Sequence, residues 1–325
     1  MQAVLVARHA MNTRFEVFLI GEDEVALRAA GEAALDEVER LEAQLSRFRP
    51  TSEISRINRH GAERPVPVSH PVFGLLQRAR TVWERTEGAF DPTVGRLMRE
   101  YGFHEVAGEV AGRSESVGAQ PAPGMVEVDL AEGDRTVRLR RRGVLLDLGA
   151  IGKGYAIDCA VASLRESGIT SAFVHGGTSS AYGLGRRAGG GCWKAAIAGP
   201  DGPPEEVELC DEALGVSASA GRCEEAAGGV GRRVIDPRRG EVVQSGLVAA
   251  VRLPSAADSD ALSTALLVLG QRGLRLLPVH WPEGRFFLLG PGQNALRPAR
   301  STEYHWPRRA DRQRTEREGP DDLNG

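Results

Sequence analysis

The stretch that decides the fold runs from residue 143 to residue 154 and reads GVLLDLGAIGKG. Its apolar half predicts a buried strand over residues 143–148, and its small residues predict a tight turn into a helix that reaches about residue 167. Such a turn lets a phosphate approach the helix N-terminus. The stretch is not a GxxxxGK[ST] phosphate loop, because Gly154 follows Lys153, and it is not GxGxxG. A ligand-binding turn and a plain strand-to-helix turn are both open interpretations.

The segments around this stretch combine hairpins with a few helices. Helices are expected over residues 24–45, 71–87 and 258–270, and a short helix or turn over 52–58. Strands are expected in residues 1–20, in a hairpin around 132–134, and around 171–175, 195–198, 207–209, 215–217, 233–235, 248–252 and 286–289. This order lacks the regular βαβ alternation of a doubly wound fold. It predicts an α+β protein, with mixed and antiparallel sheets and a few packed helices in a single large domain of two intimately packed halves.

The domain is expected to span residues 1–297. Residues 107–125 are rich in Gly, Ser and Pro and predict a surface loop. Residues 298–325 are polar and charged, without periodicity, and predict a disordered tail. The chain has 325 residues, which allows one large domain or two modest ones.

Composition excludes several classes of protein. The net charge of −3 gives no basic field for nucleic acid. No apolar run is long enough to span a membrane, and the first residues read as a strand rather than a signal peptide, which predicts a cytoplasmic protein. The four cysteines form no CxxC pair, so neither a zinc site nor a redox motif is indicated. Their even number permits disulfides, but a chain this long does not need them, and reduced thiols are expected.

The second candidate site is the segment DSDALST at residues 258–264. If a helix begins here, Asp260 and Thr264 share one face, because they are four residues apart. A carboxylate and a hydroxyl together suit a hard cation such as Mg²⁺. The alternative interpretation is helix capping by Asp258 or Ser259.

Three other segments also allow two interpretations. In residues 88–95, the ring of Phe90 is placed either beside a planar ligand or inside a packed turn. His175 ends a predicted strand and is either a base or ligand or, more often, a hydrogen-bonded structural residue. Four arginines in residues 232–240 either bind phosphate through their fork geometry or line a solvated turn.

Taken together and in order, these segments resemble the FAD:protein FMN transferase (ApbE-like) family. The matching segments are residues 11–13, 45–58, 88–95, 147–155, 175–177, 234–237 with Gly240, and 260–270. The resemblance implies a Mg²⁺-dependent transferase that cleaves FAD at its diphosphate. It attaches FMN through a phosphoester to a Thr or Ser of a target flavoprotein and releases AMP.

The resemblance also implies roles for individual residues. Asp260, Thr264 and the main-chain carbonyl of Ala150 match the metal positions, and Ser263 stands at a further, often acidic, metal position. The residues on FAD-contacting positions are Met11, Phe48, Ala89, Phe90, Asp91, Asp147, Lys153 and Ile235. Phosphoryl transfer needs positioning and charge neutralisation, which makes Asp260, Thr264 and Lys153 the candidate catalytic residues. This hypothesis requires the 147–154 turn and the 258–264 segment to meet in the fold.

The sequence also departs from the family pattern. Asn12 replaces a glycine, Phe48 replaces a tyrosine, and Arg233 replaces a histidine that is a plausible base. Arginine stays protonated at neutral pH and does not accept a proton. Residues 175–178 and 218–222 differ as well. Two alternatives follow: an FAD-binding protein that has lost transfer activity, or a Mg²⁺-dependent FAD pyrophosphatase that yields FMN and AMP.

Overall fold

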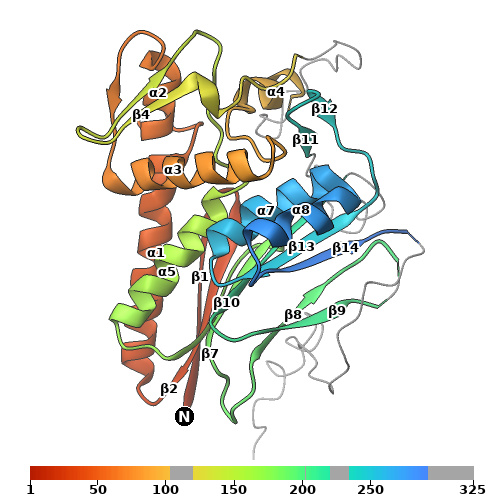
Figure 1. The fold of residues 1–325 in the computed structure, drawn as a ribbon. Coiled ribbons are helices and arrows are strands. Elements are labelled where there is room, and N and C mark those ends of the chain that lie inside the picture. Colours follow the sequence, from red (N-terminus) through yellow and green to blue (C-terminus); the bar gives the residue numbers. More distant parts are fainter. Residues whose placement is uncertain (103–119, 202, 220–233, 292–325) are drawn as a thin grey trace, which may run out of the picture. The chain divides into compact units, whose positions relative to one another are not determined.

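The computed structural model describes residues 1–102, 120–201, 203–219 and 234–291 (Figure 1). All of them belong to one compact unit, Met1–Ala295. Most of the 107–125 segment and the whole of 298–325 lie outside the described residues, so the predicted loop, tail and domain bounds stay predictions. None of the described helices combines the length and apolarity needed to cross a membrane.

A seven-stranded sheet forms the centre of the described chain. Its strands, in spatial order, are β1 (Gln2–Ala10), β2 (Thr13–Gly21), β6 (Ser171–Gly176), β7 (Ser180–Gly185), β10 (Glu212–Ala218), β13 (Val248–Leu253) and β14 (Arg285–Leu289). Every neighbouring pair is antiparallel. The β1–β2 turn consists of Met11 and Asn12, with φ of 50° and 58°, which suits a two-residue hairpin. The predicted α+β class with antiparallel sheets is confirmed.

Three helices cover one face of this sheet: α1 (Glu24–Leu45), α5 (Gly152–Glu166) and α7 (Ala256–Leu269) (Figure 1). The strand residues that face them, such as Val17 and Val174, are fully buried. Eleven of the fourteen residues of α7 are buried, because the helix packs on α5, β10 and β13 together. Gly215 permits the contact with β10: a Cβ there would overlap the Ser259 carbonyl.

The hairpin β8 (Trp193–Ile197) and β9 (Glu205–Leu209) belongs to a second apolar cluster. Trp193 packs edge-on against Phe18 of β2, with ring centroids 5.8 Å apart, and lies 5.7 Å from the Phe173 ring of β6. Phe18 and Phe173 alternate with residues on the helix-covered side, so the hairpin lies against the opposite face. The Trp193 indole N–H donates to the Leu184 carbonyl at 2.9 Å.

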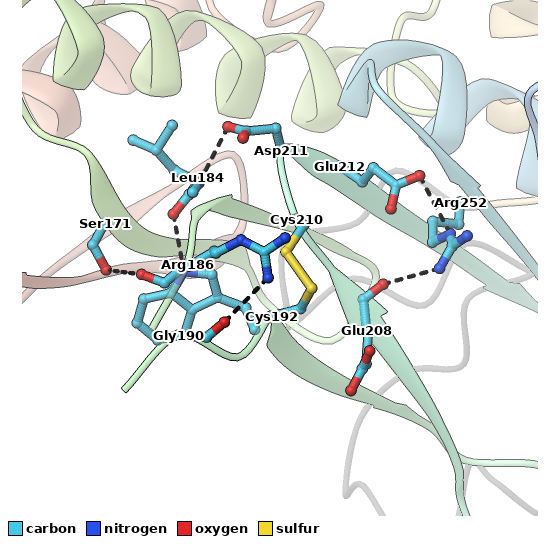
Figure 2. Close-up of a disulfide and its surroundings, with 12 residues drawn as sticks. Ser171, Leu184, Arg186, Gly190, Cys192, Glu208, Cys210, Asp211, Glu212 and Arg252 are labelled. Carbon is cyan, nitrogen blue, oxygen red and sulfur yellow. Dashed lines mark hydrogen bonds and ion pairs between the residues drawn. A yellow bond between two sulfur atoms is a disulfide. The ribbon is translucent and has the colours of Figure 1, made fainter. Parts of the chain in front are cut away.

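A disulfide joins Cys192 to Cys210 at the open end of this hairpin (Figure 2). The expectation of reduced thiols is therefore wrong for this pair. The reason is the strand register: Trp193 pairs with Leu209, so the next residues outward face each other, with Cα atoms 5.1 Å apart. Cys159 is a free thiol, and Cys223 lies outside the described residues.

A second group of elements lies above α5 and α7 in the view of Figure 1. It contains the helices α2 (Glu53–His60), α3 (His70–Arg85) and α4 (Gly95–Glu100), the short helix η1 (Met125–Glu127), and the sheet of β3 (Val66–Pro67), β5 (Thr136–Leu139) and β4 (Val128–Ala131). The remaining elements are β11 (Ile235–Asp236), β12 (Glu241–Val242), η2 (Gly270–Arg272) and α8 (Gly273–His280). One continuous apolar core joins this group to the helix-covered face of the large sheet.

The strand predicted over residues 143–148 is wrong. The segment forms only an isolated bridge, between Leu145 and Val94. The Asn58 side chain bonds both the N–H of Leu146, at 2.7 Å, and its carbonyl, at 2.9 Å. Since a side chain satisfies this backbone, no ladder partner is required.

Candidate functional site

Several turns and strand ends lie together at one end of the large sheet, where its central strands start or stop. Gly177 donates its N–H to the Arg14 carbonyl at 2.9 Å, which places the β6–β7 turn beside the start of β2. Val216 donates to the Ser179 carbonyl at 2.7 Å, which places the end of β10 beside the same turn. The Met11–Asn12 turn joins β1 to β2 at this end of the sheet. Sequence segments that are far apart are therefore neighbours here.

Helix α7 is fixed at its N-terminus by groups from other helices. The N-cap of the helix is Ser255, so the interpretation of Asp258 or Ser259 as its cap is wrong by three or four residues. Asp158 of α5 accepts the N–H groups of Ala256, at 2.7 Å, and Ala257, at 3.0 Å. Asp258 instead forms a bidentate ion pair with Arg78 of α3. The helix begins at Ala256, so Asp260 is not one of its capping residues, and its side chain faces other elements.

The carboxylate of Asp260 meets the turn at residues 147–154. Its Oδ2 accepts the N–H of Gly154 at 3.1 Å and lies 3.6 Å from the Lys153 ammonium. Its Oδ1 accepts the Ser180 hydroxyl at 3.2 Å. In a regular helix the Gly154 N–H would return to the carbonyl of Ala150, four residues earlier. The two segments that the hypothesis requires to be adjacent are in direct contact.

Hydroxyl groups surround the next turn of α7. Ser217 of β10 lies 2.8 Å from the Ser263 hydroxyl and 3.2 Å from the Thr264 hydroxyl. Ser263 also donates to the Asp260 carbonyl at 2.9 Å. Ser217 was not predicted, and a serine on a short strand offers no local signal. The cluster adds oxygen donors on the face of α7 that carries Asp260 and Thr264.

At the other end of the 147–154 turn, Asp147 pairs with Arg47. The Arg47 Nε lies 2.8 Å from Oδ2, and the Gly149 N–H donates to Oδ1 at 2.8 Å. The Arg47 guanidinium carbon lies 4.2 Å from the centroid of the Phe48 ring, which is 53% exposed. Burial lowers the pKa of Arg47, against the opposing charge of Asp147. Arg47 lies within a segment singled out by the resemblance, but its pairing has no local signal.

The 88–95 turn lies beside the same segment, because the Asp147 N–H donates to the Pro92 carbonyl at 2.7 Å. Ala89 is buried, and Phe90 is only 2% exposed, so the packed-turn interpretation describes the Phe90 ring. Asp91 Oδ1 accepts the N–H of Thr93 at 2.8 Å and its hydroxyl at 2.7 Å. Burial raises the pKa of Asp91 to about 6, against these hydrogen bonds.

The remaining candidates have structural partners. His175 Nε2 lies 3.0 Å from a Glu16 carboxylate oxygen, and Nδ1 lies 3.1 Å from the Gly177 carbonyl, as the structural interpretation expects. Arg238 pairs with Asp236 inside its own turn, next to the buried Ile235. Arg233 and residues 220–222 lie outside the described residues.

Known proteins that are similar to this chain come from one family. A model of the ApbE family matches residues 11–283. An FAD:protein FMN transferase from Vibrio cholerae serotype O1 is 30% identical over 273 residues, which cover 81% of each chain. One from Rhodobacter capsulatus is 36% identical over 201 residues, covering 61% of this chain and 38% of that protein.

Solved structures show the same fold. A mutant of the flavin transferase ApbE from Vibrio cholerae superposes with a TM-score of 0.74 at 25% identity, covering 89% of this chain and 94% of the other. The ApbE protein from Thermotoga maritima gives 0.76 at 24% identity, covering 91% and 97%.

Proposed function

This chain belongs to the ApbE family, and from that premise we propose that it is a flavin transferase that uses FAD as substrate. The reaction joins FMN through a phosphoester to a Thr or Ser hydroxyl of an acceptor flavoprotein. The bond between the FMN phosphorus and the bridging oxygen breaks, and the acceptor oxygen bonds to that phosphorus. AMP leaves with the bridging oxygen, and the hydroxyl proton is released.

The observation that carries the proposal is the contact between Asp260 and the first turn of α5. The Gly154 N–H and the Lys153 ammonium both face the Asp260 carboxylate, at 3.1 and 3.6 Å. A helix N-terminus and an ammonium are suited to the charge of a diphosphate. The placement supports the roles that the resemblance assigns to Lys153 and Asp260.

The oxygen donors at this place fit a Mg²⁺ ion. They are the Asp260 carboxylate and the hydroxyls of Thr264 and Ser263, to which the resemblance adds the Ala150 carbonyl. Mg²⁺ prefers such hard oxygen ligands. The described residues contain no group of three or more His, Cys, Asp or Glu side chains placed to hold a metal. This suits Mg²⁺, which is usually held by one or two carboxylates together with substrate phosphates. A bound ion would neutralise charge on the diphosphate.

The remaining candidates have binding roles in this proposal. Asp147 is oriented by Arg47 and by the Gly149 N–H, and it is assigned to accept a hydrogen bond from the flavin ring. Phe48, which is 53% exposed and lies against the Arg47 guanidinium, is assigned to pack on the ring. Met11, Ala89, Asp91 and Ile235 keep the FAD-contacting roles that the resemblance implies.

The cellular compartment is part of the proposal. The sequence predicts the cytoplasm, whereas the Cys192–Cys210 disulfide favours an oxidising compartment, because cytosolic thiols are kept reduced. The proposed compartment is therefore an oxidising one, in which this bond persists.

The test is incubation of the protein with FAD, Mg²⁺ and a panel of flavoprotein domains, followed by mass spectrometry of the acceptor. The expected result is an acceptor that carries one FMN, with AMP in equal amount. Asp260→Asn is expected to lower the rate on the order of a hundredfold. Asp134→Asn, on the exposed β4–β5 turn, is the matched control. FMN and AMP without an adduct would instead identify a pyrophosphatase, and unchanged bound FAD would identify a binding protein.

A further inference from the structure

Lys153 holds a position that its proposed role does not by itself explain. Its ammonium donates to the Gly149 carbonyl at 3.0 Å and lies 3.6 Å from Asp260 Oδ2. The side chains are 17% and 4% exposed, so the ion pair is largely shielded from water. Lys153 therefore neutralises the same carboxylate that is assigned to a divalent cation.

This pairing weakens the site for a free cation. A divalent ion at the Asp260 carboxylate would lie close to an ammonium, and like charges at such distances repel strongly where water is scarce. The Ser180 hydroxyl and the Gly154 N–H also donate to the same carboxylate. Among the described residues no further carboxylate or imidazole completes a metal cluster with it. Cation and ammonium compete for one negative charge.

A dinucleotide changes this balance. Its diphosphate supplies new negative charges, and a lysine side chain is a flexible point charge that can turn from one anion to another. If the ammonium moves to the phosphate, the carboxylate becomes available to the cation. The move is short, because Lys153 lies in the first turn of α5, beside the proposed phosphate site.

We propose that Lys153 is an exchangeable counter-ion, paired with Asp260 in the nucleotide-free protein and with the diphosphate in the complex. Divalent cation and dinucleotide then bind cooperatively. The inference rests on the proposed function, which places the diphosphate at this helix end. By linkage, each ligand raises the affinity for the other by the same factor, on the order of tenfold or more.

The first test uses Mn²⁺ on the nucleotide-free protein, with the free ion measured by electron paramagnetic resonance. Lys153→Met removes the competing charge at nearly the same size, and it is expected to bind Mn²⁺ about tenfold more tightly than the wild type. In EDTA, the same variant is expected to bind FAD about tenfold more weakly, measured by flavin fluorescence. Opposite changes in the two affinities are not expected of a residue that only supports the fold.

Two variants serve as controls. Lys194→Met changes the only other lysine, which pairs with Glu206 on the β8–β9 hairpin, and is expected to leave both affinities unchanged. Lys153→Arg keeps the positive charge and is expected to keep weak Mn²⁺ binding. A folded Lys153→Met protein with unchanged or weaker Mn²⁺ affinity would overturn the inference.

A second measurement needs no variant. Calorimetry of wild-type protein with ADP, in excess Mn²⁺ and in EDTA, is expected to give an affinity at least tenfold higher with the cation. Equal affinities would overturn the inference and leave the proposed function standing. If the wild type does not bind FAD even in the presence of Mn²⁺, the proposed function itself is contradicted, and the inference falls with it.

Discussion

The Arg47 guanidinium binds Asp147 through Nε and Oδ2, 2.8 Å apart, and so joins the segment after α1 to the segment before α5. The same guanidinium lies over the Phe48 ring, at 4.2 Å. One side chain thus orients both the carboxylate assigned to the flavin's hydrogen bond and the ring assigned to its face. Because the pair is largely buried, removal of one partner leaves the other charge without compensation, which is costly.

We predict that Arg47→Ala separates recognition of the flavin from recognition of the nucleotide. FAD affinity in EDTA is expected to fall about tenfold, because Asp147 and Phe48 lose their common partner. Affinity for ADP, which lacks the flavin, is expected to change less than about twofold. Flavin fluorescence and calorimetry give the two values. Arg49→Ala, which removes an exposed pair with Glu42, is the matched control. Equal losses for FAD and ADP would contradict the role.

Asp91 predicts a pH dependence of stability. Its pKa is raised from 3.8 to about 6 by burial, so the folded state binds this proton more tightly than the unfolded state. The stabilisation that this tighter proton binding provides is fully present below about pH 4, near the pKa of the unfolded state. It is lost as the pH rises through about 6, the pKa of the folded state. The wild type is expected to gain about 1.4 kcal/mol between pH 7.5 and pH 5, relative to Asp91→Asn. Urea unfolding of both proteins at both pH values measures the free energies of unfolding. The same change with pH in the wild type and in the variant would contradict the prediction.

Gly154 is a helix position at which alanine is expected to destabilise the protein. A Cβ there would overlap the Ala256 carbonyl and lie 2.8 Å from the Asp260 Cβ, so Gly154→Ala must push α5 away from α7. We expect a loss of about 2 kcal/mol in stability. Gly74→Ala in α3, where a Cβ meets nothing within 4 Å, is expected to stabilise by about 0.5–1 kcal/mol. Chemical denaturation compares the two variants, and the same sign for both would refute the argument.

The disulfide predicts a redox-dependent stability. Cys192 and Cys210 are 18 residues apart, and closing such a loop is worth about 3 kcal/mol. The double variant Cys192→Ala, Cys210→Ala is expected to lose that amount in urea unfolding. Alkylation of the native oxidised protein is expected to spare both cysteines. Cys159 is also expected to react slowly at pH 8, because burial raises its pKa to about 11. Rapid labelling of Cys192 or Cys210 without reductant would count against the bond.

Elements with a strong local pattern could be predicted from the sequence. The helix predicted over residues 24–45 matches α1, because its apolar stripe is long and Asp23 caps it. Strand β7 was missed, since SAYGLG is too rich in small residues to show alternation. Helix α8 was missed as well, and it contains Pro278, which normally argues against a helix.

The site could be predicted only where the chain carries a recognisable segment. The contact between the 147–154 turn and Asp260 follows from the resemblance and is present in the fold. Arg47 and Ser217 reach the site through pairings between distant segments, and no local pattern reveals which partner a charged or hydroxyl side chain will meet. The Cys192–Cys210 bond was missed for the same reason, because strand register decides it.

The near-complete burial of α7 has a consequence for amide hydrogen exchange. Its backbone protons are expected to exchange only when the whole domain opens, since neighbouring elements enclose most of its surface. Phe48 and the 149–150 turn belong to irregular backbone nearer the solvent and should exchange sooner. Binding of FAD is therefore expected to slow deuterium uptake in α7 as well as in the loops, because a ligand that binds only the folded protein raises the free energy of global opening.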